Sequence, residues 1–127
     1  MKALKLIIPA MLLLFAACVY DYEEPTETPD FDEMDPISLS EDVVPIFEAN
    51  CLGAGCHGEG GIPPVLTAEQ AHDDLHDFEQ LDLDNPEDSI LYQRMIDTAR
   101  PMPPAGVLPQ DQLNTVLGWI AQGAQDN

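Results

Sequence analysis

Apolar residues recur at helical spacing most clearly near the C-terminus of the chain. After Pro109, four of them follow one another at i, i+3, i+4 and i+7, namely Leu113, Val116, Leu117 and Ile120. Gly123 comes shortly after this repeat, and glycine commonly ends helices because it adopts a left-handed backbone conformation without strain. The pattern therefore predicts a helix between Pro109 and Gly123.

A second helical pattern leads into a cysteine. Ser38 and Glu41 have the spacing of a capping box, and a group of apolar residues follows them: Val43, Val44, Ile46 and Phe47. Pro45 interrupts this stretch, and proline is compatible with a helix only in the first turn. We therefore expect the regular helix to begin near Asp42 and to end at about Asn50.

Two weaker helical patterns lie between these. Thr67 and Gln70 have capping-box spacing and predict a helix over about residues 68–78, whose acids and histidines indicate a mostly exposed position. A further helix is predicted over residues 85–96, or one residue longer, because Asn85 is a favourable N-cap residue and proline is tolerated just after it. No alternating run of apolar and polar residues indicates a strand. The chain is thus predicted to form an all-α domain of about four short helices.

The chain is strongly acidic. Its 127 residues include 24 aspartates and glutamates against four lysines and arginines, which gives a formal net charge of −20. Lys2 and Lys5 precede the predicted helices, so Arg94 and Arg100 are the permanent cations that remain. Such a chain cannot neutralise phosphates, which argues against binding to nucleic acid or to an anionic membrane surface. Basic partner proteins are expected instead.

The N-terminus resembles an export signal. Residues 1–17 combine a short basic start with an apolar run that is too short to cross a bilayer as a helix. Cys18 follows the small residues Ala16 and Ala17, as in bacterial lipoprotein signals, although Phe15 departs from the usual leucine. We expect cleavage before Cys18, lipidation of its side chain, and a protein anchored to a bacterial membrane, inner or outer, facing the periplasm.

The mature chain divides into two parts. Residues 18–36 are rich in acids and prolines and have few apolar groups, so this part is predicted to be a disordered tether. Residues 37–127 contain the helical patterns and are predicted to be one domain. A domain of this size buries a limited fraction of its surface and often needs a disulfide, a metal or a cofactor for stability.

The stretch CLGAGCHG supplies a candidate for that group. Cys51 and Cys56 are followed directly by His57, and this arrangement can bond both vinyl groups of a haem and set an imidazole under its iron. The usual motif has two residues between the cysteines, whereas this one has four. On a regular helix the extra pair would turn the sulfurs apart by roughly 200°. We therefore expect a bulged loop in which Gly53 and Gly55 adopt positive φ angles.

Other uses of these residues stay open. Cys51 and Cys56 could form a disulfide in an oxidising compartment, although this would give His57 no role. They could also bind zinc together with His57 and either His72 or His76, but the sequence has no second pair of closely spaced ligands. A Cys/His nucleophile is less favoured still, because two neighbouring thiols would oxidise after export.

A methionine in a proline-rich loop is the candidate for the second axial ligand. Met102 stands between Pro101 and Pro103, whose rings restrict the backbone and would hold a weak thioether ligand in place. Met95 is the main rival, but it belongs to the apolar face of a predicted helix, where packing in the core explains it better. The remaining candidates are the two histidines of the acidic helix, His72 and His76.

Together these segments resemble a small monohaem class I cytochrome c, of the kind found in bacterial lipoproteins with the longer attachment loop. The resemblance covers about residues 43–124 and rests on the segments VVPIFEAN, CLGAGCHG, SILYQRMI, PMPP and LNTVLGWIAQGA. It implies a cytochrome c-like fold packed around one covalent haem c. Cys51 and Cys56 would attach the haem, and His57 and Met102 would bind its iron.

The resemblance also implies contacts around the cofactor. The first helix would cross the last one, with Phe47 and Trp119 near the crossing. The carbonyl group of Ile62 or of Pro63 would accept a hydrogen bond from the imidazole of the proximal histidine, which would fix the ring and raise its basicity.

Iron with a nitrogen and a thioether ligand has no vacant position, so we expect an electron carrier and not an enzyme. Arg94 and Arg100 are candidates for pairing with the haem propionates, and Arg100 is preferred because it adjoins the ligand loop. The acidic stretch from Glu69 to Asp88 either docks a basic redox partner or is simply solvated. Two alternative functions stay open: a haem c sensor or peroxidase-like subunit with a labile distal ligand, and a haem-free structural lipoprotein with a disulfide.

Overall fold

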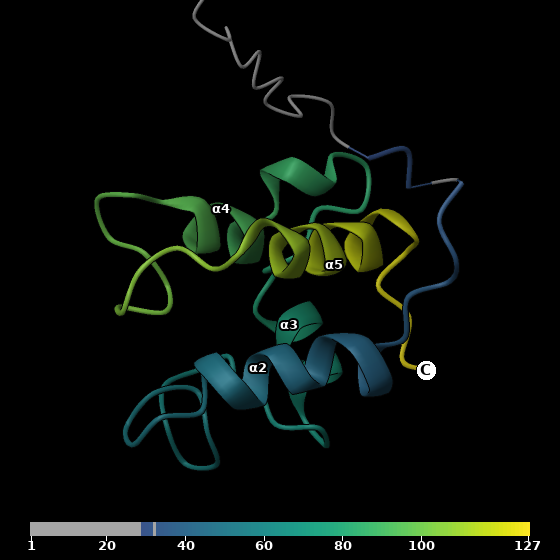
Figure 1. The fold of residues 1–127 in the computed structure, drawn as a ribbon. Helices are drawn as coiled ribbons and strands as arrows, with labels where there is room; N and C mark the ends of the chain where they lie inside the picture. Colours follow the sequence, from purple (N-terminus) through teal and green to yellow (C-terminus); the bar gives the residue numbers. More distant parts are fainter. Residues whose placement is uncertain (1–28, 32) are drawn as a thin grey trace, which may run out of the picture.

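In a computed structural model, the protein forms short helices connected by long loops (Figure 1). The structure describes residues 29–31 and 33–127, so the predicted signal peptide and Cys18 lie outside the described residues. Within the described part there is no β-strand, and the prediction of an all-α domain is confirmed. None of the helices in that part combines the length and the apolar character needed to cross a membrane.

The first helical segment begins with a π-helical turn. This turn, η2, spans Leu39–Val43 and continues directly into α2, Val44–Asn50. Ser38 caps it as predicted, because its Oγ accepts a hydrogen bond from the N–H of Glu41 at 3.2 Å. The predicted capping box also has the side chain of Glu41 accept a hydrogen bond from the N–H of Ser38. In the structure this N–H donates to Oδ2 of Asp42 instead, at 2.8 Å. The proline of α2 lies in its first turn, as expected.

The two middle helices are shorter than predicted. α3 spans Ala71–Asp77 and α4 spans Ile90–Ile96. The capping box predicted for Thr67 and Gln70 is wrong, because the N–H of Gln70 donates to the backbone carbonyl of Thr67 at 3.1 Å and no side chain caps α3. The predicted start of α4 near residue 85 is also wrong. A separate 3-10 turn, η3, spans Pro86–Asp88 and ends at Ser89, whose ψ of 130° breaks the helical path.

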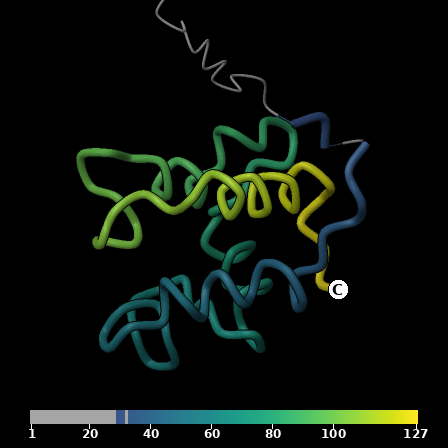
Figure 2. The backbone as a smooth tube through the Cα atoms, in the orientation of Figure 1, coloured from purple at the N-terminus to yellow at the C-terminus, as the bar shows by residue number. Residues whose placement is uncertain are grey.

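The last helix agrees closely with the prediction. α5 spans Gln110–Ala121, and Gly123 follows it with a φ of 98°, the left-handed conformation expected of a helix-ending glycine. The predicted apolar repeat is buried, together with Trp119. α5 contacts α4, η2 and η3, so it runs through the middle of the fold (Figures 1 and 2).

One hydrophobic core joins the first helical segment to the last. Phe47 and Trp119 are both fully buried in this core, and η2 contacts α5. Asn127 strengthens the same junction: its backbone oxygen accepts a hydrogen bond from Oγ of Ser38 at 2.8 Å, and its Oδ1 accepts one from the N–H of Leu39 at 2.8 Å. The end of the chain is thereby held against the start of η2.

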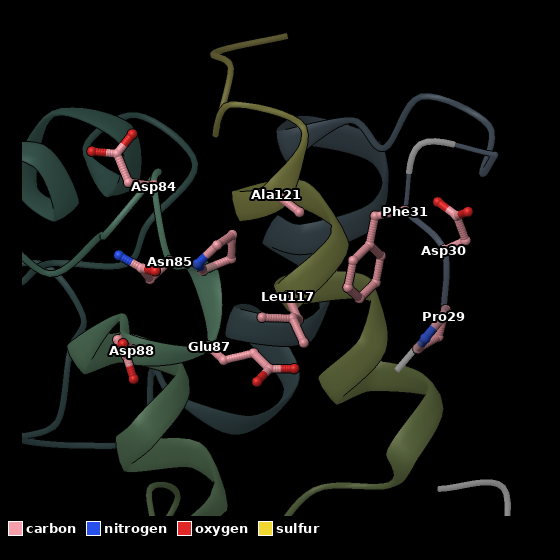
Figure 3. Close-up of a pocket in the computed structure, with 10 residues that line it drawn as sticks. Pro29, Asp30, Phe31, Asp84, Asn85, Glu87, Asp88, Leu117 and Ala121 are labelled. Atoms are coloured by element: carbon pink, nitrogen blue, oxygen red, sulfur yellow. The ribbon is translucent and has the colours of Figure 1, made fainter. Parts of the chain in front are cut away.

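The end of the predicted tether contacts α5. The ring of Phe31 faces this helix (Figure 3). Gly118 allows the approach, because a Cβ atom there would lie 3.0 Å from the Phe31 ring and 2.6 Å from Ile37. Nε2 of Gln122 donates to the backbone oxygens of Phe31 and Asp35 at 3.2 and 3.3 Å. Contacts with the helices thus begin before Ile37, where the domain was predicted to start.

Candidate functional site

Three of the predicted site residues line one cavity, which lies between α2, α4 and the loops that follow these helices. The cavity has a volume of about 280 Å³. Cys51, His57 and Met102 line it, whereas Cys56 is not among its lining residues. Most of the other walls are hydrophobic, and they include Phe47, Leu66, Leu91 and Met95. The fold therefore brings together chemically active side chains that are far apart in the sequence.

The chain between the two cysteines forms turns and not a helix, as predicted. α2 ends immediately before Cys51, whose N–H still donates to the carbonyl of Phe47 at 2.7 Å. The N–H of Cys56 then donates to the carbonyl of Gly53 at 2.8 Å, and the N–H of His57 donates to the carbonyl of Cys51 at 3.1 Å. These bonds fold the loop back on itself, so His57 returns to the side of the first cysteine.

Two glycines shape this loop and the turn after it. Gly55 has a φ of 77°, as predicted, but Gly53 does not have a positive φ, so that part of the prediction is wrong. Gly61 was missed by the sequence analysis. A Cβ atom at Gly61 would clash with the carbonyl oxygen of Cys56, which accepts a hydrogen bond from the N–H of Ile62 at 2.7 Å. No sequence signal marks this glycine, because the close approach arises only in the folded loop.

The His57 ring is held in a defined tautomer. Its Nδ1 lies 3.0 Å from the carbonyl oxygen of Ile62 and 2.9 Å from that of Pro64. Carbonyl oxygens only accept hydrogen bonds, so the proton of the neutral ring is on Nδ1, and Nε2 keeps a lone pair that can bind a metal. The prediction that the carbonyl of Ile62 accepts a hydrogen bond from the imidazole is therefore confirmed. The alternative acceptor, the carbonyl of Pro63, is wrong, because the second carbonyl at Nδ1 belongs to Pro64.

Cys51 and Cys56 are unpaired, half-buried thiols. Burial raises the pKa of Cys51 to about 11, and the neighbouring Cys56 acts in the same direction. The Cys51 side chain is consequently a neutral thiol at physiological pH. Because the thiolate is the nucleophilic form of cysteine, this environment does not suit a Cys/His catalytic nucleophile.

Two methionines line the cavity. Met102 is half-buried, and its N–H donates to the carbonyl of Arg94 at 2.9 Å, which holds the proline-rich loop against α4. Met95 is only 3% exposed and belongs to the core, as expected, but it also lines the cavity. Two thioethers thus line the cavity, one from the loop residue Met102 and one from the helical residue Met95.

The other candidate ligands lie elsewhere. His72 and His76 of α3 contact each other, with ring centroids 4.6 Å apart, and neither lines the cavity. Among the residues that the structure describes, no group of three or more His, Cys, Asp or Glu side chains is arranged to hold a metal ion, so the zinc alternative lacks a ligand set there. Arg94 lines the cavity, whereas Arg100, the arginine preferred from the sequence, is exposed outside it.

The cavity is lined by an imidazole, two thioethers and the Cys51 thiol, together with mostly apolar side chains. Imidazole and thioether groups are ligands for transition metals, not for hard ions such as calcium or magnesium. No protein-family model, curated protein or solved structure matches the chain. Its function is therefore inferred from its own residues.

Proposed function

We propose that the protein is an electron carrier with a cytochrome c-like fold and one covalent haem c. In this proposal Cys51 and Cys56 attach the haem, and His57 and Met102 bind its iron. The observation that supports it most directly is that Cys51, His57 and Met102 line the same apolar cavity. Their meeting would be hard to explain if the cysteines served only as a disulfide, because neither the histidine nor the methionine would then have a role.

The residues of the cavity fit a haem in their chemistry. The hydrogen bonds from Nδ1 of His57 leave Nε2 available, which is the arrangement that metal-binding histidines commonly have. Phe47, Leu66 and Leu91 are apolar groups of the kind that cover a flat aromatic macrocycle. Arg94 adds a permanent cation at the wall, where it could pair with a propionate.

Each of these residues would have a separate part in electron transfer. A haem with two protein ligands supplies a reversible one-electron change at iron. The two carbonyls at Nδ1 keep the His57 ring oriented and increase the basicity of its Nε2. The Met102 thioether favours the ferrous state and so raises the reduction potential. The apolar side chains of the cavity would cover part of a bound haem, which would limit the rearrangement that accompanies a change of charge.

The partner that we propose is a basic redox protein. The loop between α3 and α4 is rich in acidic residues, and it leads to Ile90, the first residue of α4, which is 49% exposed and also lines the cavity. Leu83, in the same loop, is 48% exposed. Acidic groups around exposed apolar side chains complement a basic surface and steer its approach. Docking at Ile90 would bring such a partner next to the cavity.

We also propose that the protein is exported and anchored through a lipid on Cys18, facing the periplasm. The N-terminal pattern of residues 1–18 supports this location. The acidic stretch that follows Cys18 would separate the anchor from the helical domain, and its last residues contact α5 through Gln122.

Expression in a bacterial host with a periplasmic haem-attachment system tests the proposal. The purified protein should be coloured, and the polypeptide should keep its pigment after denaturation and extraction with acidified acetone, because the thioether bonds are covalent. The oxidised protein should show the weak absorption near the red end of the spectrum that accompanies sulfur ligation. Met102→Ala should remove this band, whereas Met95→Ala should keep it.

The controls separate the alternatives. Cys51→Ser with Cys56→Ser should leave the extracted polypeptide colourless. Rapid binding of carbon monoxide by the reduced protein would favour a sensor or peroxidase-like subunit, because it requires a labile distal ligand. A colourless wild-type protein from the competent host would overturn the haem proposal and favour the disulfide-stapled structural lipoprotein.

A further inference from the structure

The loop that carries Met102 is joined to α4 by one backbone hydrogen bond, and two further hydrogen bonds shape the turn that leads to it. The N–H of Met102 donates to the carbonyl of Arg94, in the last turn of α4, at 2.9 Å. Asp97 is the residue that follows α4, and its Oδ1 accepts hydrogen bonds from the N–H of Ala99 at 2.8 Å and of Arg100 at 3.1 Å. The chain is thus bound to the helix at Met102 and shaped by Asp97 on the way there.

The side chain of Asp97 contributes mainly through its bonds to the backbone. Its Oδ2 also lies 3.6 Å from Nη1 of Arg94, but the two side chains are 28% and 37% exposed, and partly solvated ion pairs of this kind stabilise little. The pKa of Asp97 is lowered first by the N–H groups of Ala99 and Arg100, and only to a lesser extent by the two arginines. Both observations indicate that the acceptor geometry of the carboxylate matters more than its charge.

We infer that Asp97 is a positioning residue for Met102: its carboxylate fixes the turn over residues 97–100, so that Met102 reaches the carbonyl of Arg94 and its thioether stays at the cavity. This inference rests on the proposed function and adds to it the element that keeps the distal ligand in place. A thioether is a weak, neutral ligand, so its binding is sensitive to the freedom of the loop that carries it. Loss of the turn would increase that freedom.

Three variants separate this role from simpler ones. Asp97→Ala removes the acceptor and the charge together. Asp97→Asn keeps Oδ1 as an acceptor and removes only the charge. Asp77→Ala, at the end of α3, removes an exposed carboxylate outside the cavity and therefore matches the change in net charge.

Two measurements on the haem-bearing protein read the effect. The first is hydrogen exchange of the Met102 amide, whose acceptor is Arg94 and not Asp97. The second is the pH at which the red-end absorption of sulfur ligation is half lost. We expect Asp97→Ala to accelerate the exchange by about tenfold and to lower that pH by about one unit, as the loss of one to two net hydrogen bonds implies. Asp97→Asn and Asp77→Ala should change the exchange by less than about twofold.

Two results would overturn the inference. Faster exchange at Ala99 and Arg100, with Met102 and the absorption band unchanged, would mean that Asp97 only caps a local turn. An effect of Asp97→Asn as large as that of Asp97→Ala would mean that charge, and not acceptor geometry, is responsible. If Asp97→Ala does not fold, Asp97→Ser takes its place, because a serine hydroxyl accepts these bonds more weakly.

The exchange measurement also keeps the two proposals distinguishable. A wild-type protein without covalent haem would overturn the proposed function, and the exchange rate of the Met102 amide in the folded chain would still test the role of Asp97.

Discussion

The carbonyl oxygen of Cys56 is one atom on which the shape of the loop over residues 51–62 depends. It accepts the N–H of Ile62, whose own carbonyl then faces Nδ1 of His57. Gly61 permits this turn because it has no Cβ atom to meet that oxygen. The orientation of the imidazole is therefore linked, through two backbone carbonyls, to a glycine that carries no chemistry of its own.

We expect Gly61→Ala to lower the free energy of unfolding by about 1–3 kcal/mol, because the new methyl group must displace a backbone carbonyl and not a flexible side chain. Denaturation in urea measures the change. Gly58→Ala is the matched control, because its Cβ would lie 3.5 Å from the carbonyl oxygen of Leu52, an ordinary contact. This variant should lower the free energy of unfolding by less than about 1 kcal/mol. Equal losses in the two variants would contradict the role of Gly61.

The Cys51 thiol should react slowly in the folded, haem-free protein. Its pKa of about 11, against an ordinary value of 9.0, leaves roughly a hundredfold less thiolate at pH 8 than in the unfolded chain. Alkylation by iodoacetamide followed by peptide mass spectrometry compares the folded protein with the protein in urea. Similar rates in the two states would show that the thiol is not shielded.

The same shift has a consequence for stability at high pH. The folded-state pKa of Cys51 lies above the unfolded one, so the group does not affect stability below pH 9. Between pH 9 and about 11 the unfolded chain loses this proton first, and stability should therefore fall as the pH rises. The free energy of unfolding of wild type and of Cys51→Ser, measured over this pH range, tests this. The fall due to Cys51 should be present in wild type and absent from the variant.

At the scale of elements, α5 organises the molecule. It contacts α4, η2 and η3, and Gln122, the residue that follows it, contacts the chain before Ile37. Gln122 makes this last contact by donating to Phe31 and Asp35 and by accepting the N–H of Ile37 at 2.8 Å. One side chain thus holds the N-terminal segment along the helix.

Gln122→Ala should free that segment. We expect a loss of about 1–2 kcal/mol in the free energy of unfolding, since three hydrogen bonds at a partly solvated site are removed. Limited proteolysis should also cut more rapidly within residues 29–36. Gln125→Ala is the control, because its backbone oxygen would still accept a hydrogen bond from the indole N–H of Trp119. A cleavage rate that is equal in the two variants would contradict the contribution of Gln122.

At the scale of the whole molecule, charge is the dominant feature. A formal net charge of −20 on 127 residues produces a negative potential that attracts cations and repels anions before any contact is made. The acidic loop between α3 and α4 leads directly to Ile90, the first residue of α4, which lines the cavity. Electron exchange at the cavity should therefore depend on the charge of the reagent.

We expect the rate of the reaction with hexaammineruthenium(III), a cation, to fall as salt is added, because salt weakens its attraction to the acidic protein. With the anion ferricyanide the rate should rise with salt, because screening over roughly 10 Å at 0.1 M weakens the repulsion. Stopped-flow spectroscopy measures both rates. The same salt dependence for the two reagents would contradict electrostatic steering.

A matched pair of double variants locates the effect. Asp84→Asn with Asp88→Asn neutralises two residues of the loop beside Ile90, whereas Asp111→Asn with Asp126→Asn makes the same change in net charge on α5 and near the C-terminus. The first variant should slow the reaction with hexaammineruthenium(III) by several-fold and the second should change it less. Equal effects would mean that net charge alone, and no particular surface, controls the rate.

Features that depend on neighbouring residues could be predicted from the sequence. The apolar repeat of α5, the Ser38 cap and the turns at Gly55 and Gly123 follow from local periodicity and backbone preference, and the structure confirms them. The candidate thiol, imidazole and thioether groups of the site are likewise read directly from the residues Cys51, His57 and Met102. The predictions of capping at α3 and of an unbroken helix through Ser89 were wrong, since other local bonds compete there.

Contacts between distant parts of the chain required the tertiary structure. Only the folded chain reveals that Cys51, His57 and Met102 line one cavity, that Arg94 and not Arg100 joins them, and that Pro64 supplies a carbonyl to the imidazole. The reason is that short-range hydrogen bonds and side-chain periodicity are set by the nearest residues, whereas the path of the loops depends on packing around the shared core. That packing brings a cysteine, a histidine and a methionine together at one site.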